Sequence, residues 1–316
     1  MSGPASIVLA GASGTIGRAV AAALLEDGHN VTCVVRRSAS GEEATADPAL
    51  ASAQFHFVEA YDEAQLFHLF EEAAPQVVIS CIASRTGEPG DAKRVDLEAN
   101  LALLGEAERS GAEQFISLSA ICLQRPHLAF QHAKLAFEER LAASDIAHTI
   151  VRPTAFFKSL SGQVDRVARG KPFLVFGSGE ATRCKPIGNE DLARFIADCV
   201  GRADAYGRIL TIGGPGPALS PREQGAILFE LTGRAPRYRS VPVGLFPLAA
   251  RVLSLGERWS GRMARGAEYA RIAHYYATES MLVLDTETST YSETATPSFG
   301  TQTLRAHYAK LLAERG

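Results

Sequence analysis

The sequence predicts an α/β protein: a doubly wound parallel Rossmann sheet, with a smaller mixed C-terminal substrate-binding part. Two observations support this prediction. Short apolar, β-branched runs alternate with helix-like stretches through the first half of the chain, and a glycine-rich turn separates the first run from the first helix-like stretch. Such alternation is typical of a parallel sheet covered by helices. We expect the sheet domain to span residues 1–152 and the substrate-binding part to span 153–316.

The elements follow in order along the chain. Residues 6–10 form an apolar run, and residues 18–27 form an alanine-rich helical segment closed by Gly28. Residues 38–50 carry no aromatic side chain and one β-branched one, so we expect a mobile surface loop there. After residue 153 the loops lengthen, although residues 208–212 are expected to return to the sheet. Further strands are expected at 31–35, 55–58, 77–82, 115–118 and 149–151.

Composition narrows the function. The 316 residues are 46% hydrophobic with a net charge of -3, so no basic field attracts a polyanion and nucleic-acid binding is not expected. The five cysteines are odd in number and widely spaced, which indicates reduced thiols, no metal site and a cytoplasmic location. No stretch is apolar enough to span a membrane. Peripheral membrane contact stays open, and so does the choice between monomer and homodimer.

The glycine-rich turn predicts a dinucleotide site. A G-x-x-G-x-x-G pattern at the end of the first strand lets a pyrophosphate approach the N-terminus of the following helix, because bare backbone leaves room for it. The residues expected to contact the cofactor here are Gly11, Ser13, Gly14, Thr15, Ile16 and Gly17.

Two arginines point to NADPH. Where an NAD enzyme places an acid on the ribose, the end of the second strand carries Arg36 and Arg37, and arginine suits a 2′-phosphate. A solvated basic loop is the alternative interpretation. Small residues after the fourth strand, Cys81, Ala83 and Ser84, lie where the adenosine half of the cofactor is expected, although small residues also serve close packing.

The glycine spacing resembles that of the short-chain dehydrogenase/reductase superfamily, whose usual catalytic pair is Tyr-x-x-x-Lys. Here the corresponding segment runs from Phe130 to Lys134, so the lysine is present and the tyrosine is not. A phenyl ring has no proton to give. Either catalysis has been lost, or the substrate does not need a phenolic acid.

More specific motifs occur at residues 118–122, 130–134, 152–160, 184–187, 191–200, 212–216 and 275–285. Together these motifs resemble those of the NADPH-dependent divinyl chlorophyllide 8-vinyl reductases. The resemblance implies reduction of the 8-vinyl group of a divinyl chlorophyllide, or of its protochlorophyllide precursor, to ethyl, and it makes phenylalanine at the tyrosine position a family trait.

The resemblance also implies roles for single residues. Lys134 would bond the nicotinamide ribose, Ser119 would bond the nicotinamide or substrate unless it merely caps a helix, and Pro153 and Thr154 would lie near the carboxamide. The proton donor stays open among Lys134, a water, Tyr275 and Tyr276; we take Tyr276 as the tyrosine candidate. A flat apolar pigment with a propionate needs aromatic walls and a cation at the rim. The candidates are Phe156, Phe157 and Lys158, with Arg183 and Lys185 as other cations.

Two alternatives remain beside this family: a non-catalytic NADP-sensing regulator on the same fold, and a reductase of a small carbonyl or phenolic substrate. The missing tyrosine favours the regulator, whereas the motifs of the second half favour the vinyl reductase. The apolar stretch 244–255 could be a pocket lid, a dimer face or core.

Overall fold

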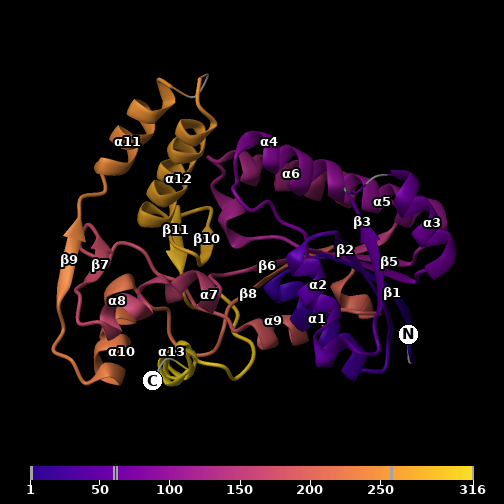
Figure 1. Ribbon diagram of the computed structural model, residues 1–316, viewed down its shortest axis with the longest axis horizontal. Helices are drawn as coiled ribbons and strands as arrows, with labels where there is room; N and C mark the ends of the chain where they lie inside the picture. Colours follow the sequence, from indigo (N-terminus) through magenta and orange to yellow (C-terminus); the bar gives the residue numbers. More distant parts are fainter. Residues whose placement is uncertain (1–2, 60, 62, 257–258, 315–316) are drawn as a thin grey trace. The chain divides into compact units, whose positions relative to one another are not determined.

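The computed structural model describes residues 3–59, 61, 63–256 and 259–314. The chain divides into two compact units (Figure 1). The first comprises Met1–Leu123, Ala129–Arg152 and Leu192–Leu210, and the second comprises Gln124–Leu128, Pro153–Asp191 and Thr211–Gly316.

A seven-stranded sheet organises the first unit. Its strand order is β3-β2-β1-β4-β5-β6-β8, and the pairs β3–β2, β2–β1, β1–β4, β4–β5 and β5–β6 are all parallel. The order reverses between β1 and β4, which is where doubly wound sheets bind ligands at their carboxyl ends. The expected fold class and the return of residues 208–212 are confirmed. The strands are β1 (Ser6–Ala10), β2 (Asn30–Arg36), β3 (Gln54–Val58), β4 (Val77–Ser80), β5 (Gln114–Leu118), β6 (Ala147–Pro153) and β8 (Arg208–Ile212).

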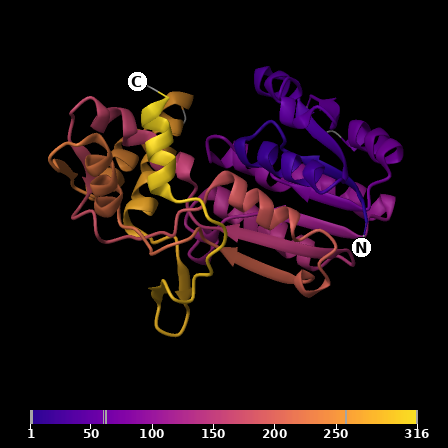
Figure 2. The same ribbon diagram turned by 90° about the horizontal axis from the view of Figure 1, so that it is seen from below.

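Helices cover both faces of this sheet (Figures 1 and 2). On one face, α3 (Glu63–Ala73), α5 (Ala99–Ser110) and α6 (Ala129–Ala142) bury apolar side chains against the strands in one continuous core. On the other face lie α1 (Thr15–Glu26) and α9 (Asn189–Ala197), each with a buried apolar stripe. The short α4 (Pro89–Ala92) leads into a π-helical turn, Lys93–Glu98, before α5.

The expectation of a mobile loop over residues 38–50 was wrong. That segment contains α2 (Ala39–Thr45) and a 3₁₀ turn, Pro48–Leu50, in which the Ala49 amide donates to the Asp47 side chain. Ala44 and Leu50 are buried. Two apolar contacts with the core therefore order a segment whose composition alone indicated a loop.

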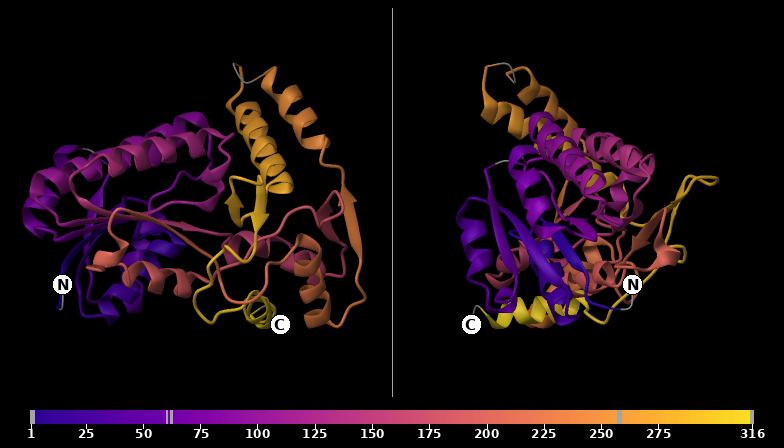
Figure 3. Two further views of the ribbon diagram at one scale, coloured as in Figure 1. Left: turned by 180° about the vertical axis from the view of Figure 1, so that it is seen from behind. Right: turned by 90° about the vertical axis from the view of Figure 1, so that its right-hand side faces the viewer.

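The second unit has its own core, made by helices α7 (Phe157–Leu160), α8 (Val164–Ala168), α10 (Pro221–Thr232) and α13 (Leu304–Ala313) with strand β7 (Phe173–Phe176). Strand β7 pairs in parallel with β9 (Tyr238–Val241), and β10 (Val283–Asp285) pairs antiparallel with β11 (Thr290–Ser292). Helices α11 (Leu245–Ser254) and α12 (Gly261–Thr278) pack on each other (Figure 3). Tyr308 is completely buried and donates to the Leu160 carbonyl.

No helix among the described residues is long and apolar enough to cross a bilayer.

Candidate functional site

The glycine turn is built for close backbone approach. Gly11 follows β1 with a φ of +92°, and a Cβ there would lie 2.8 Å from the Cys81 backbone. A Cβ on Gly17 would lie 2.2 Å from the Gly11 carbonyl oxygen, so only glycine lets the helix start this close to the strand. Helix α1 begins at Thr15, and its N-cap, Gly14, supplies no side-chain cap. The first amides of α1 can therefore bind an anion, aided by the helix dipole.

Residues Ser13, Thr15 and Ile16 lie in and just after this turn, with Ser13 and Ile16 half-buried and Thr15 exposed. At the neighbouring strand β4, Cys81 and Ser84 are half-buried and Ala83 is exposed. The carboxyl ends of β1 and β4 adjoin, so the two groups of residues lie at the same edge of the sheet. Burial raises the pKa of the Cys81 thiol to about 12, while the nearby Lys134 ammonium lowers it.

The two arginines after β2 differ in their surroundings. Arg36 and Arg37 are both exposed. Arg37 forms an ion pair with Glu59 at 3.3 Å, and its guanidinium lies 5.5 Å from the centre of the Phe57 ring. Within the described residues, the Arg36 side chain has no such ion pair. Arg36 is thus the guanidinium left available for a phosphate.

Lys134 lies on α6 with its side chain inside the protein. It is 9% exposed, and its Nζ lies 3.1 Å from Oδ1 of Asp96, which is 1% exposed. The same Oδ1 accepts a hydrogen bond from the Ser84 amide, whereas Oδ2 of Asp96 is buried and has no hydrogen-bond partner among the described residues. The buried Asp96 carboxylate therefore holds the Lys134 side chain in place.

The π-helical turn places Asp96 for this contact. Asn100, on the first turn of α5, donates to the carbonyls of Val95 and Asp96 and accepts a 2.5 Å hydrogen bond from the Ser80 hydroxyl. One buried amide therefore connects the end of β4 to the turn that carries the carboxylate. π-helical turns inside helices are frequent at functional sites.

Ser119 begins a second buried polar network. Its amide donates to the Val151 carbonyl, and its hydroxyl donates to Oε1 of Glu138 at 2.5 Å. Glu138 also receives two hydrogen bonds from the Arg152 guanidinium, one of them from Nε at 3.1 Å. The Ser119 hydroxyl is thereby oriented and retains its lone pairs for a further donor. It follows β5 directly, and among the described residues its hydroxyl hydrogen bond goes to Glu138 and not to a helix amide.

The residue in the usual tyrosine position, Phe130, lies one helical turn before Lys134 and is half-buried. Its neighbour Gln131 is completely buried and donates to the Cys122 carbonyl. A phenyl ring offers no hydrogen-bonding group, so Phe130 cannot donate a proton as the usual tyrosine would.

In the second unit, Pro153 and Thr154 are buried where the chain leaves β6. The Thr154 amide donates to the Ile212 carbonyl, and its hydroxyl donates to the Lys185 carbonyl. Both polar groups of Thr154 are thus used in holding the chain.

The candidate substrate residues have different surroundings. Phe157 is buried in the core of the second unit, with its ring centre 5.2 Å from that of His307, whereas Phe156 is half-buried and Lys158 is exposed. On α12, Tyr275 is buried and Tyr276 is 44% exposed, with the two ring centres 5.6 Å apart.

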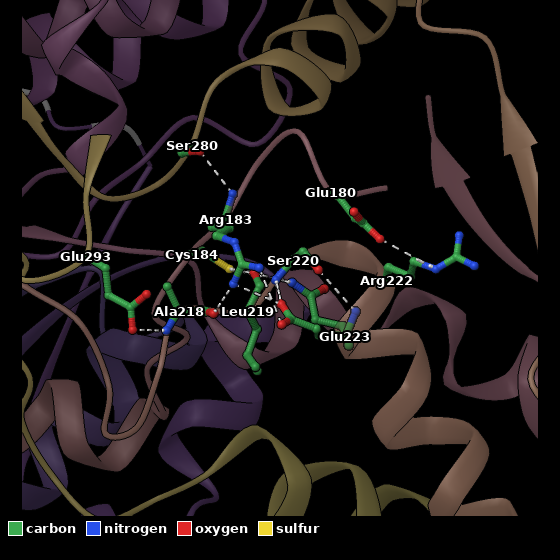
Figure 4. Close-up of polar contacts among 11 residues, drawn as sticks. Glu180, Arg183, Cys184, Ala218, Leu219, Ser220, Arg222, Glu223, Ser280 and Glu293 are labelled. Carbon is green, nitrogen blue, oxygen red and sulfur yellow. Dashed lines mark hydrogen bonds and ion pairs between the residues drawn. The ribbon is translucent and has the colours of Figure 1, made fainter. Parts of the chain in front are cut away.

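Figure 4 shows how Arg183, another candidate cation of this unit, is held. The Arg183 guanidinium donates to the Ala218 carbonyl at 2.8 Å and forms an ion pair with Glu223 at 3.1 Å. Lys185, which is not drawn there, is buried and donates from Nζ to the Thr296 carbonyl at 3.1 Å. Lys158 and Arg183 are thus exposed, whereas Lys185 is buried.

The stretch 244–255 is not core. It forms most of α11, and Leu245, Leu248, Val252 and Leu255 are exposed, while Ala250 is buried.

Sequence reasoning missed Asp96 and Glu138. A signal for Glu138 exists: Gln131, Lys134 and Glu138 recur at helical spacing, so three polar residues share one face of α6, and all three are buried. Asp96 and Asn100 are also four residues apart, next to apolar positions of the same helix. Periodicity alone cannot tell such a face from a solvated one.

Comparison with known proteins identifies the family. A family described as NAD(P)H-binding matches residues 11–203. Divinyl chlorophyllide a 8-vinyl-reductase, chloroplastic, of Zea mays is 44% identical over 322 residues, covering 98% of this chain and 80% of that protein. The protein of the same name from Cucumis sativus is also 44% identical, covering 98% of this chain and 76% of its own.

Among solved structures, NADPH-dependent quinone oxidoreductase QOR2 of Escherichia coli, complexed with NADPH, superposes with a TM-score of 0.68 at 17% identity. That match covers 98% of this chain and 99% of the other, and at such identity it shows the fold alone. The sequence matches are stronger: this chain belongs to the divinyl chlorophyllide a 8-vinyl-reductase family.

Proposed function

We propose that this protein uses NADPH to reduce the 8-vinyl group of a 3,8-divinyl chlorophyllide, or of its protochlorophyllide precursor, to ethyl. The observation that carries the proposal is the 44% identity, over 98% of the chain, to proteins named for that activity. The protein is accordingly an oxidoreductase of chlorophyll biosynthesis, acting on a carbon–carbon double bond.

The first unit offers what a dinucleotide needs. The Gly11 and Gly17 positions leave space that any Cβ would fill, and the partnerless Asp96 Oδ2 is a buried acceptor suited to a ribose hydroxyl. The first amides of α1 would hold the pyrophosphate, Arg36 the 2′-phosphate and Lys134 the nicotinamide ribose. The bound cofactor supplies hydride.

The residues of the chain then have two tasks, which are to orient the cofactor and the pigment and to deliver one proton. Hydride addition to the vinyl group leaves negative charge on the neighbouring carbon, and the conjugated macrocycle delocalises this charge. No phenol is therefore needed to stabilise an oxyanion. This accounts for Phe130 in place of tyrosine. The remaining proton would come from Lys134, which Asp96 holds, from a water, or from Tyr276 of the second unit.

We assign the cofactor to the first unit and the pigment mainly to the second, where Phe156 would contact the ring and Lys158 the propionate. Free cysteines throughout, four of them buried, support a reducing compartment such as the cytoplasm. The relatives' names place those proteins in the chloroplast. Monomer and homodimer both fit a site made by one chain.

The test is incubation of purified protein with NADPH and divinyl chlorophyllide. We expect a blue shift of the Soret band, a product heavier by two hydrogen atoms, and one NADPH consumed per pigment. A Gly17→Val variant, which fills the glycine turn, is the inactive control. Unchanged pigment with retained NADPH binding would instead support a sensor, and turnover of small quinones or carbonyls alone would support the small-substrate reductase.

A companion variant tests the role of Phe130. Because no phenol is required, Phe130→Tyr should leave kcat for vinyl reduction unchanged or lower it. Strong stimulation would mean that the acid has been misplaced.

A further inference from the structure

Helix α11 exposes an apolar stripe in the second unit. Leu245, Leu248, Val252 and Leu255 follow each other at intervals of three or four residues, so they lie on one helix face, and Leu255 is 74% exposed. Beyond the helix, Trp259 is 84% exposed. Clustered exposed apolar residues of this kind mark an interaction surface.

The stripe is not the result of a poorly packed helix. The opposite face of α11 packs on α12, where Gly266 lets Leu253 approach so closely that a Cβ would lie 3.1 Å from its Cδ1 (Figures 1 and 3). Ala250 is buried on that face. The hairpin therefore holds its stripe outward on a firm support.

The charge around the stripe is one-sided. Residues 244–267, from the start of α11 into α12, contain four arginines and a single acidic residue, Glu257, in a chain whose net charge is -3. Arg251 on α11 and Arg262 and Arg265 on α12 are exposed. Within the described part of the chain, none of these three side chains forms an ion pair. An apolar stripe bordered by cations thus stands on a protein whose overall net charge is negative.

We propose that the α11–α12 hairpin is a membrane-docking element that binds the surface of an anionic bilayer. Leucines and valine would enter the boundary of the acyl chains, Trp259 would lie at headgroup level, and the arginines would bind lipid phosphates. This is peripheral binding, and it does not depend on the proposed reaction.

Charge complementarity selects lipid over a second copy of the chain. In a symmetric dimer the same face meets itself, which would bring two arginine-rich borders together without acids between them. An anionic membrane supplies both the apolar phase and the opposite charge.

Trp259 makes the test direct, because it is the only tryptophan of the chain. We expect the full-length protein to float with vesicles of mixed phosphatidylcholine and phosphatidylglycerol, and far less with phosphatidylcholine alone. On binding, tryptophan emission should shift to the blue and be quenched by brominated lipid chains. High salt should weaken the binding.

Matched variants separate the apolar contribution to vesicle binding from the electrostatic contribution. Leu255→Glu should lower vesicle binding at least about tenfold, because it removes a leucine that would insert into the bilayer and adds a negative charge. Ile209→Glu, at an exposed residue of β8, should leave it unchanged. The pair Arg262→Glu and Arg265→Glu should also lower binding at least about tenfold, whereas Arg169→Glu with Lys171→Glu, an equal change at exposed residues, should have little effect.

Circular dichroism and melting curves would verify that each variant folds. The proposal is overturned if the wild type does not bind anionic vesicles, if neutral vesicles bind equally well, or if tryptophan emission stays unchanged on binding. It is also overturned if sedimentation shows a dimer that Leu255→Glu dissociates, since a second copy would then cover the stripe.

Discussion

Arg36 and Arg37 are neighbours in the chain with opposite prospects for binding a phosphate. Arg37 is held by Glu59 and lies against Phe57, whereas Arg36 has no ion pair within the residues described. Two adjacent guanidinium groups that look equivalent in the sequence are therefore unequal in the folded protein.

The first prediction uses this difference. Arg36→Ala should raise the Kd for NADPH more than tenfold, because a charge-assisted phosphate contact is worth about 1.5–3 kcal/mol. Arg37→Ala should raise it less, and the Kd for NADH should change little in either variant. Fluorescence titration with both cofactors measures this. Equal losses in the two variants, or equal losses for NADH, would contradict the assignment.

The second prediction concerns Glu138. Its carboxylate is buried and accepts from Ser119 and Arg152, so Glu138→Gln leaves the Arg152 guanidinium without its counter-charge. Breaking a buried pair in this way costs about 3–5 kcal/mol of unfolding free energy. Glu138→Gln with Arg152→Met removes both charges and should recover more than half of that loss. Urea unfolding measures both, and a double variant as unstable as the single one would show that the network does not act as a pair.

At the scale of elements, α1 and α9 are joined by one ion pair. Asp27 caps the C-terminus of α1, where an acid is unfavourable to the helix dipole. Arg194 of α9 donates to it from Nη1 at 2.9 Å, and this hydrogen bond is the main reason that the pKa of Asp27 is lowered. Both side chains are about one-third exposed, so solvent screens the pair.

The third prediction follows from that pair. Asp27→Asn should lower the free energy of unfolding by no more than about 1 kcal/mol at neutral pH. Because the folded pKa lies below the unfolded value of about 3.9, the contribution is complete above that value and is lost as the pH falls through the folded pKa. The difference in free energy of unfolding between the wild type and Asp27→Asn should therefore vanish in acid. Denaturant unfolding over a pH series checks this, and a gap that persists in acid would assign it to helix capping.

At the scale of the whole molecule, the residues assigned to the dinucleotide's phosphates and ribose all lie in the first unit. A ligand that binds only the folded state stabilises it by about 2.7 kcal/mol at a hundredfold excess over Kd. The fourth prediction is that such an excess of NADPH raises the Tm of this unit by roughly 5–10 °C. Gly17→Val should abolish the shift. A calorimetric scan measures it, and an equal shift in that variant would place the cofactor elsewhere.

Local sequence patterns were sufficient to predict the shape of the glycine turn. The glycine spacing gives the position of the dinucleotide turn, because a helix can start beside a strand only where no Cβ intervenes. Lys134 and Phe130 were likewise recognisable from their spacing. In contrast, residues 38–50 looked like a loop, since two buried side chains, Ala44 and Leu50, leave no periodic pattern in so short a segment.

The sequence by itself determined the fold class, the glycine turn and the family, because these depend on residues that are close together along the chain and on motifs of consecutive residues. The tertiary structure alone decided that Asp96 holds Lys134 and that Glu138 orients Ser119. It also decided that, in the part of the chain that the structure describes, Arg37 forms an ion pair and Arg36 does not. The physical reason is that these partners are many residues apart or on different elements. A contact between them exists only after the sheet has brought its strand ends to one edge.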